Sequence, residues 1–298
     1  MVKCRAGDRA AGRGETGPRI GAPGGSLTVC REIHLPKKRT FYPKGRVTAR
    51  REPTLAENQP PPMPEFDELK MLDWQTAFED DGTGDWRDGW FLDGARATVD
   101  NTLEGMVLSA GPIAGDHGSH CVLWTKATFE GDVKIEFDYC RLDTIFKFVN
   151  IIYIQATGNG DAQHHEDIRT WSDLRVIPYM RTYYNHMKTL HVSFAAYDEP
   201  DRDYVRARRY PTSDDLAFGD LALPPDSFET GLFEPGVPHR FTFIKHGDTL
   251  MFQASNGERS GLFTWDTSRF DRLTRGRIGL RHMATRCSRY ANLTISTL

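Results

Sequence analysis

Several patterns that would identify a particular class of protein are absent from this 298-residue sequence. It has five cysteines, widely spaced and without a C-x-x-C pair, so we expect reduced thiols rather than a disulfide framework. No apolar run approaches the roughly 20 residues that span a bilayer. No apolar segment typical of a secretory signal follows the N-terminus. As written, the sequence predicts a cytoplasmic protein that does not enter a membrane.

Motifs of nucleotide-binding proteins and of common hydrolases are missing as well. The glycine-rich stretches DGTGDW and ATGNGD match no dinucleotide-binding or P-loop pattern, and there is no G-x-S-x-G. Helical periodicity is almost absent, and only residues 162–173 could hold a helical turn. We therefore expect no organic cofactor, while a structural calcium ion held by loop oxygens is compatible with the sequence.

Charge is unevenly distributed along the chain. Residues 1–55 hold 13 Lys+Arg against 4 Asp+Glu, whereas the rest holds 25 against 37. The acidic remainder argues against a nucleic-acid partner. Residues 1–62, rich in Gly, Pro and Arg, are predicted to be a disordered arm before a domain at residues 63–298. A tether to an anionic surface and a leader upstream of a later start are the alternatives for this arm.

Short alternating apolar runs dominate the domain, and most are bounded by Gly, Pro, Asp or Asn. Residues 244–249 join two of them through a His-Gly-Asp turn, which is typical of a hairpin. The pattern predicts an all-β fold of two sheets, a jelly-roll sandwich. The oligomeric state stays open. The twelve predicted strands are residues 95–102, 105–110, 120–126, 132–141, 147–156, 190–197, 203–210, 239–246, 248–255, 262–265, 276–283 and 290–296.

Some of these runs, in this order, are similar to a known family. WFLDG, HCVLWTKATFEGDVKIEFDY, FVNIIYIQATG, YYNHMKTLHVSFAAY, YVRARRYP and GRIGLRHMATRCSRYANLTI resemble the YesU-like proteins, over roughly residues 72–298. The resemblance implies a concanavalin-A-like jelly roll and a link to polysaccharide degradation. It implies no catalytic residues, because the family has no settled catalytic assignment.

Residues 181–210 combine tyrosine, histidine and arginine on strands that alternate. Such side chains are costly to bury, so their face should line solvent or a site for an anionic group. Bent jelly rolls offer a concave face for glycans. The alternation suggests that this face gathers Tyr153, Gln155, His191, Tyr197, Arg206, Arg208 and Arg281.

The residue types suit β-elimination on a uronate-containing saccharide. Cations or amides must neutralise the sugar carboxylate, a base must take the neighbouring proton, and an acid must protonate the leaving oxygen. The candidate catalytic residues are His191, His186, Tyr197 and Tyr184. The candidate substrate-binding residues are Arg206, Arg208, Gln155, Tyr153, Asn150, Arg281 and Tyr210. The expected partner is an acidic oligo- or polysaccharide.

Other interpretations of these residues remain open. The arginines could pair with local acids such as Asp201 and Asp203 on a solvated strand. Glu136 and Asp138, on one strand face, could serve a glycoside hydrolase, although the pattern lacks a further acid. A lectin-like module without catalysis is the third alternative.

Metal and sugar-stacking signals in the sequence are weak. Asp116-His117-x-x-His120 and His164-His165-Glu166-Asp167 bring metal-ligand types together without zinc-site spacing, so no metal is predicted. Trp171 or Trp86, if exposed, could stack on a sugar ring, whereas Trp124 and Trp265 are expected in the core.

Overall fold

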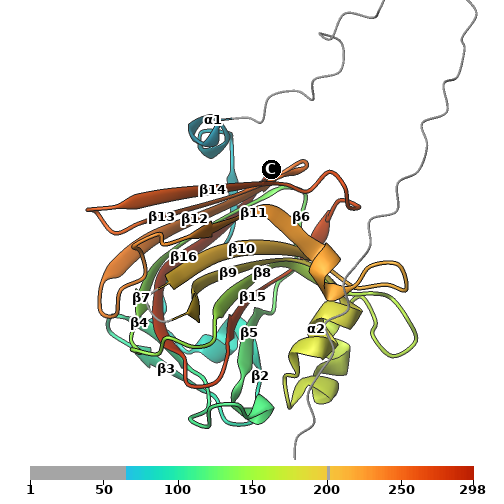
Figure 1. Cartoon of the computed structure of the whole chain (residues 1–298), viewed down its shortest axis with the longest axis horizontal. Coiled ribbons are helices and arrows are strands. Elements are labelled where there is room, and N and C mark those ends of the chain that lie inside the picture. Colours follow the sequence, from blue (N-terminus) through green and yellow to red (C-terminus); the bar gives the residue numbers. More distant parts are fainter. Residues whose placement is uncertain (1–64, 200–201) are drawn as a thin grey trace, which may run out of the picture. The chain divides into compact units, whose positions relative to one another are not determined.

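The computed structural model describes residues 65–199 and 202–298, and the predicted arm at residues 1–62 lies outside them. Two antiparallel sheets face each other across an apolar core (Figure 1). The predicted all-β sandwich is confirmed. Within the described residues, no helix has both the length and the apolarity needed to cross a bilayer.

The first sheet has eight strands. Its order is β14 (Ser260–Asp266), β13 (Thr249–Ser255), β12 (Pro238–His246), β7 (Val133–Arg141), β16 (Cys287–Thr297), β4 (Gly105–Ser109) and β3 (Thr98–Thr102), and β1 (Gln75–Asp80) pairs with β16.

The second sheet also has eight strands and lies between the first sheet and helix α2 in Figure 1. Its order is β11 (Ala222–Phe228), β10 (Arg202–Tyr210), β9 (Met187–Glu199), β8 (Asn150–Gly158), β15 (Arg275–His282), β5 (Cys121–Thr125) and β2 (Trp90–Asp93), and β6 (Phe129–Glu130) pairs with β15. We call the face of this sheet that points away from the core the concave face.

Helical pieces are short in the described part of the chain. The two α-helices are α1 (Phe66–Lys70) and α2 (Met180–His186). The 3₁₀ turns are η1 (Trp86–Asp88), η2 (His117–Ser119), η3 (Ile168–Arg175) and η4 (Phe218–Leu221). The helical turn predicted at residues 162–173 overlaps η3, whereas α2 occupies residues that the sequence suggested were a loop.

All twelve predicted strands are present, and the hairpin is confirmed because His246 pairs with Thr249 across Gly247 and Asp248. Four short strands were missed: β1, β2, β6 and β11. β11 contains Pro224 and Pro225, which argue against a strand from sequence. It is tolerated because β11 is an edge strand, where a missing N–H breaks few ladder bonds.

Alternation places the core as the pattern predicts. Along β7, Val133, Ile135, Phe137 and Tyr139 are buried between the sheets, while the residues between them face outward. Trp124 and Trp265 are buried, as expected. On the concave face, Trp124 and Tyr153 stack with their ring centroids 5.4 Å apart. Both pair with Gly279 on β15, and its missing side chain leaves room for the two rings.

We predict that Gly279→Ala lowers the free energy of unfolding by about 1–3 kcal/mol, as overpacking does. A Cβ at Gly279 would stand 2.4 Å from the Trp124 ring. Chemical denaturation measures the change. Gly219→Ala is the matched control, because a Cβ there meets no atom within 4 Å. Equal stabilities of the two variants would contradict this account.

Candidate functional site

The concave face brings five predicted site residues together. Cross-strand pairing places Tyr153, His191 and Arg208 in one row across β8, β9 and β10. Arg281 and Arg206 lie in the neighbouring row. The prediction that these five share one face is confirmed.

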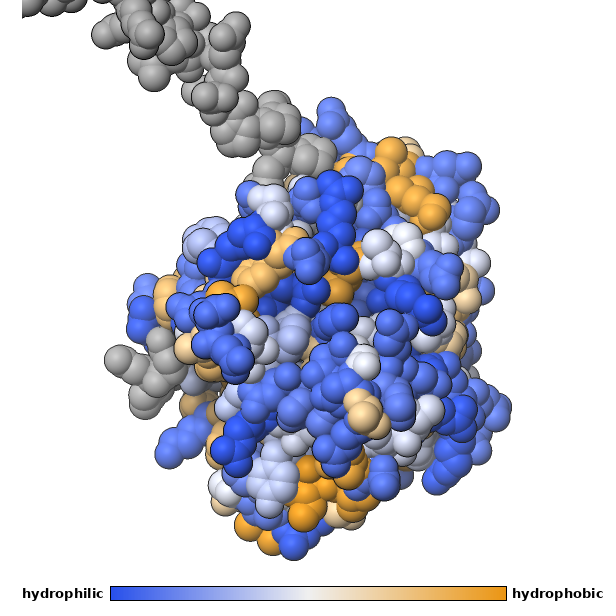
Figure 2. Space-filling view, turned by 90° about the vertical axis from the view of Figure 1, so that its right-hand side faces the viewer, coloured by the Kyte–Doolittle hydropathy of each residue, from blue (hydrophilic) through white to orange (hydrophobic). Residues whose placement is uncertain are grey.

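Residues 159–186, between β8 and β9, cover much of this face, and we call them the covering segment. Tyr183 of α2 stacks on Tyr153 with the ring centroids 5.8 Å apart and the planes parallel. Figure 2 shows this side of the molecule filled by mostly hydrophilic side chains. The predicted site residues beneath the segment are at most 1% exposed: Tyr153, His191, Tyr210 and Arg281.

A buried ion pair fastens the covering segment to the sheet. The Asp93 carboxylate of β2 accepts hydrogen bonds from Arg175 of η3, at 2.6 Å from Nε and 3.2 Å from Nη2. It also accepts bonds from Trp124 Nε1 at 2.7 Å and from the Tyr183 hydroxyl at 3.0 Å. Both members of the ion pair have fully buried side chains. Nothing in the sequence pattern marked Asp93 or Arg175 as partners.

His191 is held inside this polar network. Its Nδ1 lies 2.5 Å from the Tyr210 hydroxyl and its Nε2 lies 2.6 Å from Ser193 Oγ. Burial, followed by the nearby Arg208, lowers the pKa of His191 well below its ordinary value, so the ring is neutral. Both nitrogens are engaged and the ring is 1% exposed. In this arrangement His191 does not reach a sugar as a base.

Two β-bulges turn predicted residues away from the concave face. In β9, Phe194 and Ala195 together oppose one residue of β10, and Ala195 has φ 45°. Tyr197 therefore leaves the predicted face, and its hydroxyl accepts a bond from Arg141 of the first sheet at 2.8 Å. A bulge in β8 gives Gln155 φ 53°, and its side chain donates to carbonyls near β6. Their predicted place on this face is wrong.

Asn150 lies between the sheets. Its Nδ2 donates to the Tyr139 hydroxyl at 2.7 Å and to Ser288 Oγ at 3.0 Å, both in the first sheet. The side chain is fully buried. It cannot neutralise a carboxylate on the concave face, as the sequence suggested, without leaving the core.

Part of the concave face stays accessible, and we call it the basic strip: Tyr184, Tyr204, Arg206, Arg208 and Phe218, all partly exposed. Arg206 pairs with Asp226 of β11 at 2.5 Å. Arg208 lies over the Phe218 ring at 4.6 Å, but among the described residues it makes no hydrogen bond or ion pair. Of the local acids suggested by the sequence, Asp201 lies outside the described residues and Asp203 accepts a hydrogen bond from the N–H of Thr230 at 2.8 Å. Arg206 pairs with Asp226 instead, and Arg208 has no acidic partner among the described residues.

The alternative acids, Glu136 and Asp138, lie on the outer face of the first sheet. Cavities of about 810 and 620 Å³ meet there at Arg240 and Asn292. Asp138 is bound by Arg240 at 3.2 Å and by Asn292 at 2.6 Å.

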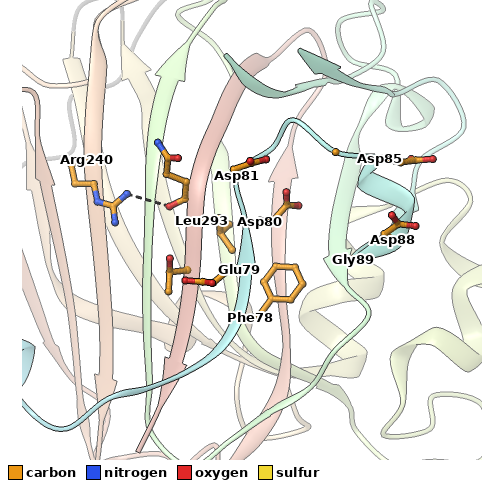
Figure 3. A pocket seen from close by; sticks show the side chains of 12 residues that line it. Phe78, Glu79, Asp80, Asp81, Asp85, Asp88, Gly89, Arg240 and Leu293 are labelled. Atoms are coloured by element: carbon orange, nitrogen blue, oxygen red, sulfur yellow. Dashed lines mark hydrogen bonds between the residues drawn. The ribbon is translucent and has the colours of Figure 1, made fainter. Parts of the chain in front are cut away.

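Figure 3 shows the larger of these cavities, with acidic side chains from β1 and the following loop on one side and Arg240 on the other. An acidic wall repels a uronate. Asp138 lines the smaller cavity. The hydrolase alternative therefore stays a prediction.

The remaining weak signals are resolved by local contacts. Asp116 pairs with Arg96 and caps η2, and His120 Nδ1 lies 3.1 Å from Arg281. Trp171 is 2% exposed, so its suggested role as an exposed sugar platform is wrong. His186 does not lie in a loop but ends α2, where its ring stacks on His164.

The comparisons with known proteins concern the fold. No family model matches the sequence, and no curated protein matches it. A Bacillus subtilis protein of unknown function with a galectin-like fold matches at TM-score 0.54 and 15% identity, covering 75% of this chain and 98% of its own. Lectin II from Ulex europaeus matches at TM-score 0.47 and 9% identity, covering 74% and 98%. The match to the galectin-like structure agrees with the jelly-roll fold, while the YesU-like assignment stays a prediction.

We predict that Asp93→Asn destabilises the fold by about 3–5 kcal/mol, because it leaves the Arg175 charge buried without its counter-ion. Thermal and chemical unfolding measure the loss. The double variant Asp93→Leu with Arg175→Met should recover much of it, since no unpaired charge remains. A double variant as unstable as the sum of the single ones would contradict this account.

Stability should also fall as the pH drops below about 6.5. Burial lowers the pKa of His120 and His282 to about 3, and it lowers the pKa of His191 well below its ordinary value. The unfolded chain binds protons between these values and 6.5 while the folded chain does not, so each histidine costs about 1.4 kcal/mol per pH unit. Urea denaturation at pH values from 5 to 6 measures the free energy of unfolding. Its dependence on pH should correspond to one proton fewer in His191→Gln than in the unaltered protein. His165→Gln, which replaces an exposed histidine, is the control.

Proposed function

We propose that this protein binds an acidic saccharide at the basic strip of its concave face. The observation that carries the proposal is Arg208, a partly exposed guanidinium without a hydrogen bond or ion pair among the described residues. A guanidinium is shaped to hold a carboxylate through two parallel hydrogen bonds. A uronate carboxylate would supply the missing partner.

The surroundings of Arg208 suit a sugar ring as well as its carboxylate. Phe218 supports the guanidinium from one side, and Tyr184 lies against Phe218 with ring centroids 4.7 Å apart. Tyr204 carries the Arg206 guanidinium 4.7 Å above its ring. Partly exposed aromatic faces favour stacking of pyranose C–H groups, while the tyrosine hydroxyls can bond sugar hydroxyls.

The field at this face also favours an anion. Arg208, Arg281 and Arg206 all lower the pKa of His191, which means that their positive charge is felt at the ring. Of the two arginines of the strip, Arg206 alone has an acidic partner, Asp226, among the described residues. A bound carboxylate would offset the remaining charge.

Binding without catalysis is the function that this geometry supports best. β-Elimination needs a base and an acid that touch the sugar. The closest candidates, His191 and Tyr210, are bonded to each other and buried. Tyr184 alone among the four predicted catalytic residues belongs to the strip, where it packs against Phe218. β-Elimination on a uronate-containing saccharide is the finer hypothesis, and the assay below separates it from binding.

We predict that Arg208→Ala weakens binding of uronate oligomers by about tenfold or more, since a hydrogen bond to a charged group contributes roughly 1.5–3 kcal/mol. Calorimetry with alginate, pectic and glucuronan oligomers measures the affinity. Arg208→Lys keeps the positive charge but loses the paired N–H donors, so its affinity should lie between those of the unaltered protein and Arg208→Ala. Arg240→Ala, on the outer face of the first sheet, is the matched control.

The same titrations decide between the alternatives. Loss of binding in Arg240→Ala but not in Arg208→Ala would move the site to the outer cavities and overturn the proposal. Absorbance of an unsaturated uronate during incubation would show elimination in addition to binding. If no uronate oligomer binds the folded protein, the proposal is wrong.

A further inference from the structure

Three potential metal ligands meet where the covering segment begins and ends. Asp161 and His164 lie in the loop after β8, and His186 is the last residue of α2. One ligand atom from each lies within 4.8 Å of the others. The predicted cluster at residues 164–167 contributes only His164 to this group. Asp167 of that cluster pairs with Arg277 instead.

The backbone holds these three residues in place. The N–H of Asn159 donates to the carbonyl of His186 at 2.9 Å, which joins the loop to the helix end. The N–H of Gly160 donates to the carbonyl of His164 at 3.0 Å and closes the loop on itself. Asp161 Oδ1 accepts the N–H of His164 at 2.7 Å. These bonds hold the backbones of the three residues close together before any ion arrives.

The side chains leave donor atoms unused. His164 is 7% exposed, and its ring stacks on that of His186 with centroids 3.8 Å apart and an interplanar angle of 8°. His164 Nδ1 lies 3.0 Å from both carboxylate oxygens of Asp161. His186 Nδ1 is shielded from solvent and has no hydrogen-bond partner. A shielded imidazole nitrogen without a partner is costly unless something binds it.

We propose that Asp161, His164 and His186 form a binding site for a divalent transition metal such as Zn²⁺. Two imidazoles and one carboxylate are a donor set that these ions prefer, and that Ca²⁺ and Mg²⁺, which take oxygen ligands, do not. Three protein ligands leave the remaining positions to water.

Binding requires a small local adjustment. Metal–nitrogen and metal–oxygen bonds are about 2.0–2.2 Å, so the donors must approach one another and the two rings must tilt from parallel. Asp161 can follow, because its side chain is 45% exposed. His186 at the end of α2 is partly exposed and not packed on all sides.

A metal bound at this site would link the two ends of the covering segment. His164 and His186 lie on either side of η3 and most of α2, the elements that carry Arg175 and Tyr183 onto the concave face. A metal bound to both histidines would tie the two ends of this segment together and lower the entropy of its opened states.

The test uses the full chain, stripped of metal with a chelator and titrated with ZnCl₂ by calorimetry and with CoCl₂ by visible absorption. We expect one ion per chain and a rise in melting temperature with Zn²⁺. His186→Ala and Asp161→Asn should each weaken the affinity by at least about tenfold. Asp161→Asn keeps an oxygen for the loop N–H groups, so it serves if His186→Ala fails to fold.

Two matched controls make the result decisive. His165→Ala removes the exposed histidine next to His164, and His117→Ala removes one from the other histidine cluster. Neither should change the affinity. Loss of binding in a control, unchanged binding in both ligand variants, or binding of Ca²⁺ in preference to Zn²⁺ would overturn the proposal. So would failure of Zn²⁺ or Co²⁺ to bind. Uronate affinity is not part of the test, so its outcome is independent of the basic strip.

Discussion

The buried carboxylate of Asp93 is the interaction on which the concave face depends. It takes hydrogen bonds from Arg175 and Tyr183 of the covering segment and from Trp124 of the sheet. A carboxylate removed from water is costly unless donors replace its hydration. The covering segment therefore packs favourably only when all these donors meet. Once packed, the covering segment shields this carboxylate and the Arg175 guanidinium from solvent.

This cover separates two kinds of polar residue on one sheet face. Beneath it, His191 and Tyr210 satisfy each other, and Arg281 donates to the carbonyl of Pro178 at 2.8 Å. Such groups specify one packing arrangement and hold a neutral histidine in place. Beyond its edge, the partly exposed Arg208 makes no hydrogen bond or ion pair with the described residues. The difference between the two arginines is access and not residue type, and the proposal of saccharide binding rests on that access.

The strands and their inward residues could be predicted from the sequence, because a period of two residues already states which side chains share a face. That reasoning placed Tyr153, His191, Arg206 and Arg208 together correctly. It failed beyond each β-bulge, at Gln155 and Tyr197, because one extra residue reverses every later side chain. Neither bulge is marked by a glycine, so periodicity alone could not locate them.

What the sequence determined by itself is the all-β architecture, the apolar interior and the presence of a polar aromatic and basic face. Only the tertiary structure decided which part of that face is open. The deciding contact, between Asp93 and Arg175, joins residues 82 positions apart. The helical pieces that carry it are too short to show a clear amphipathic period. Alternation records where a side chain points, whereas burial depends on what a distant segment brings against it.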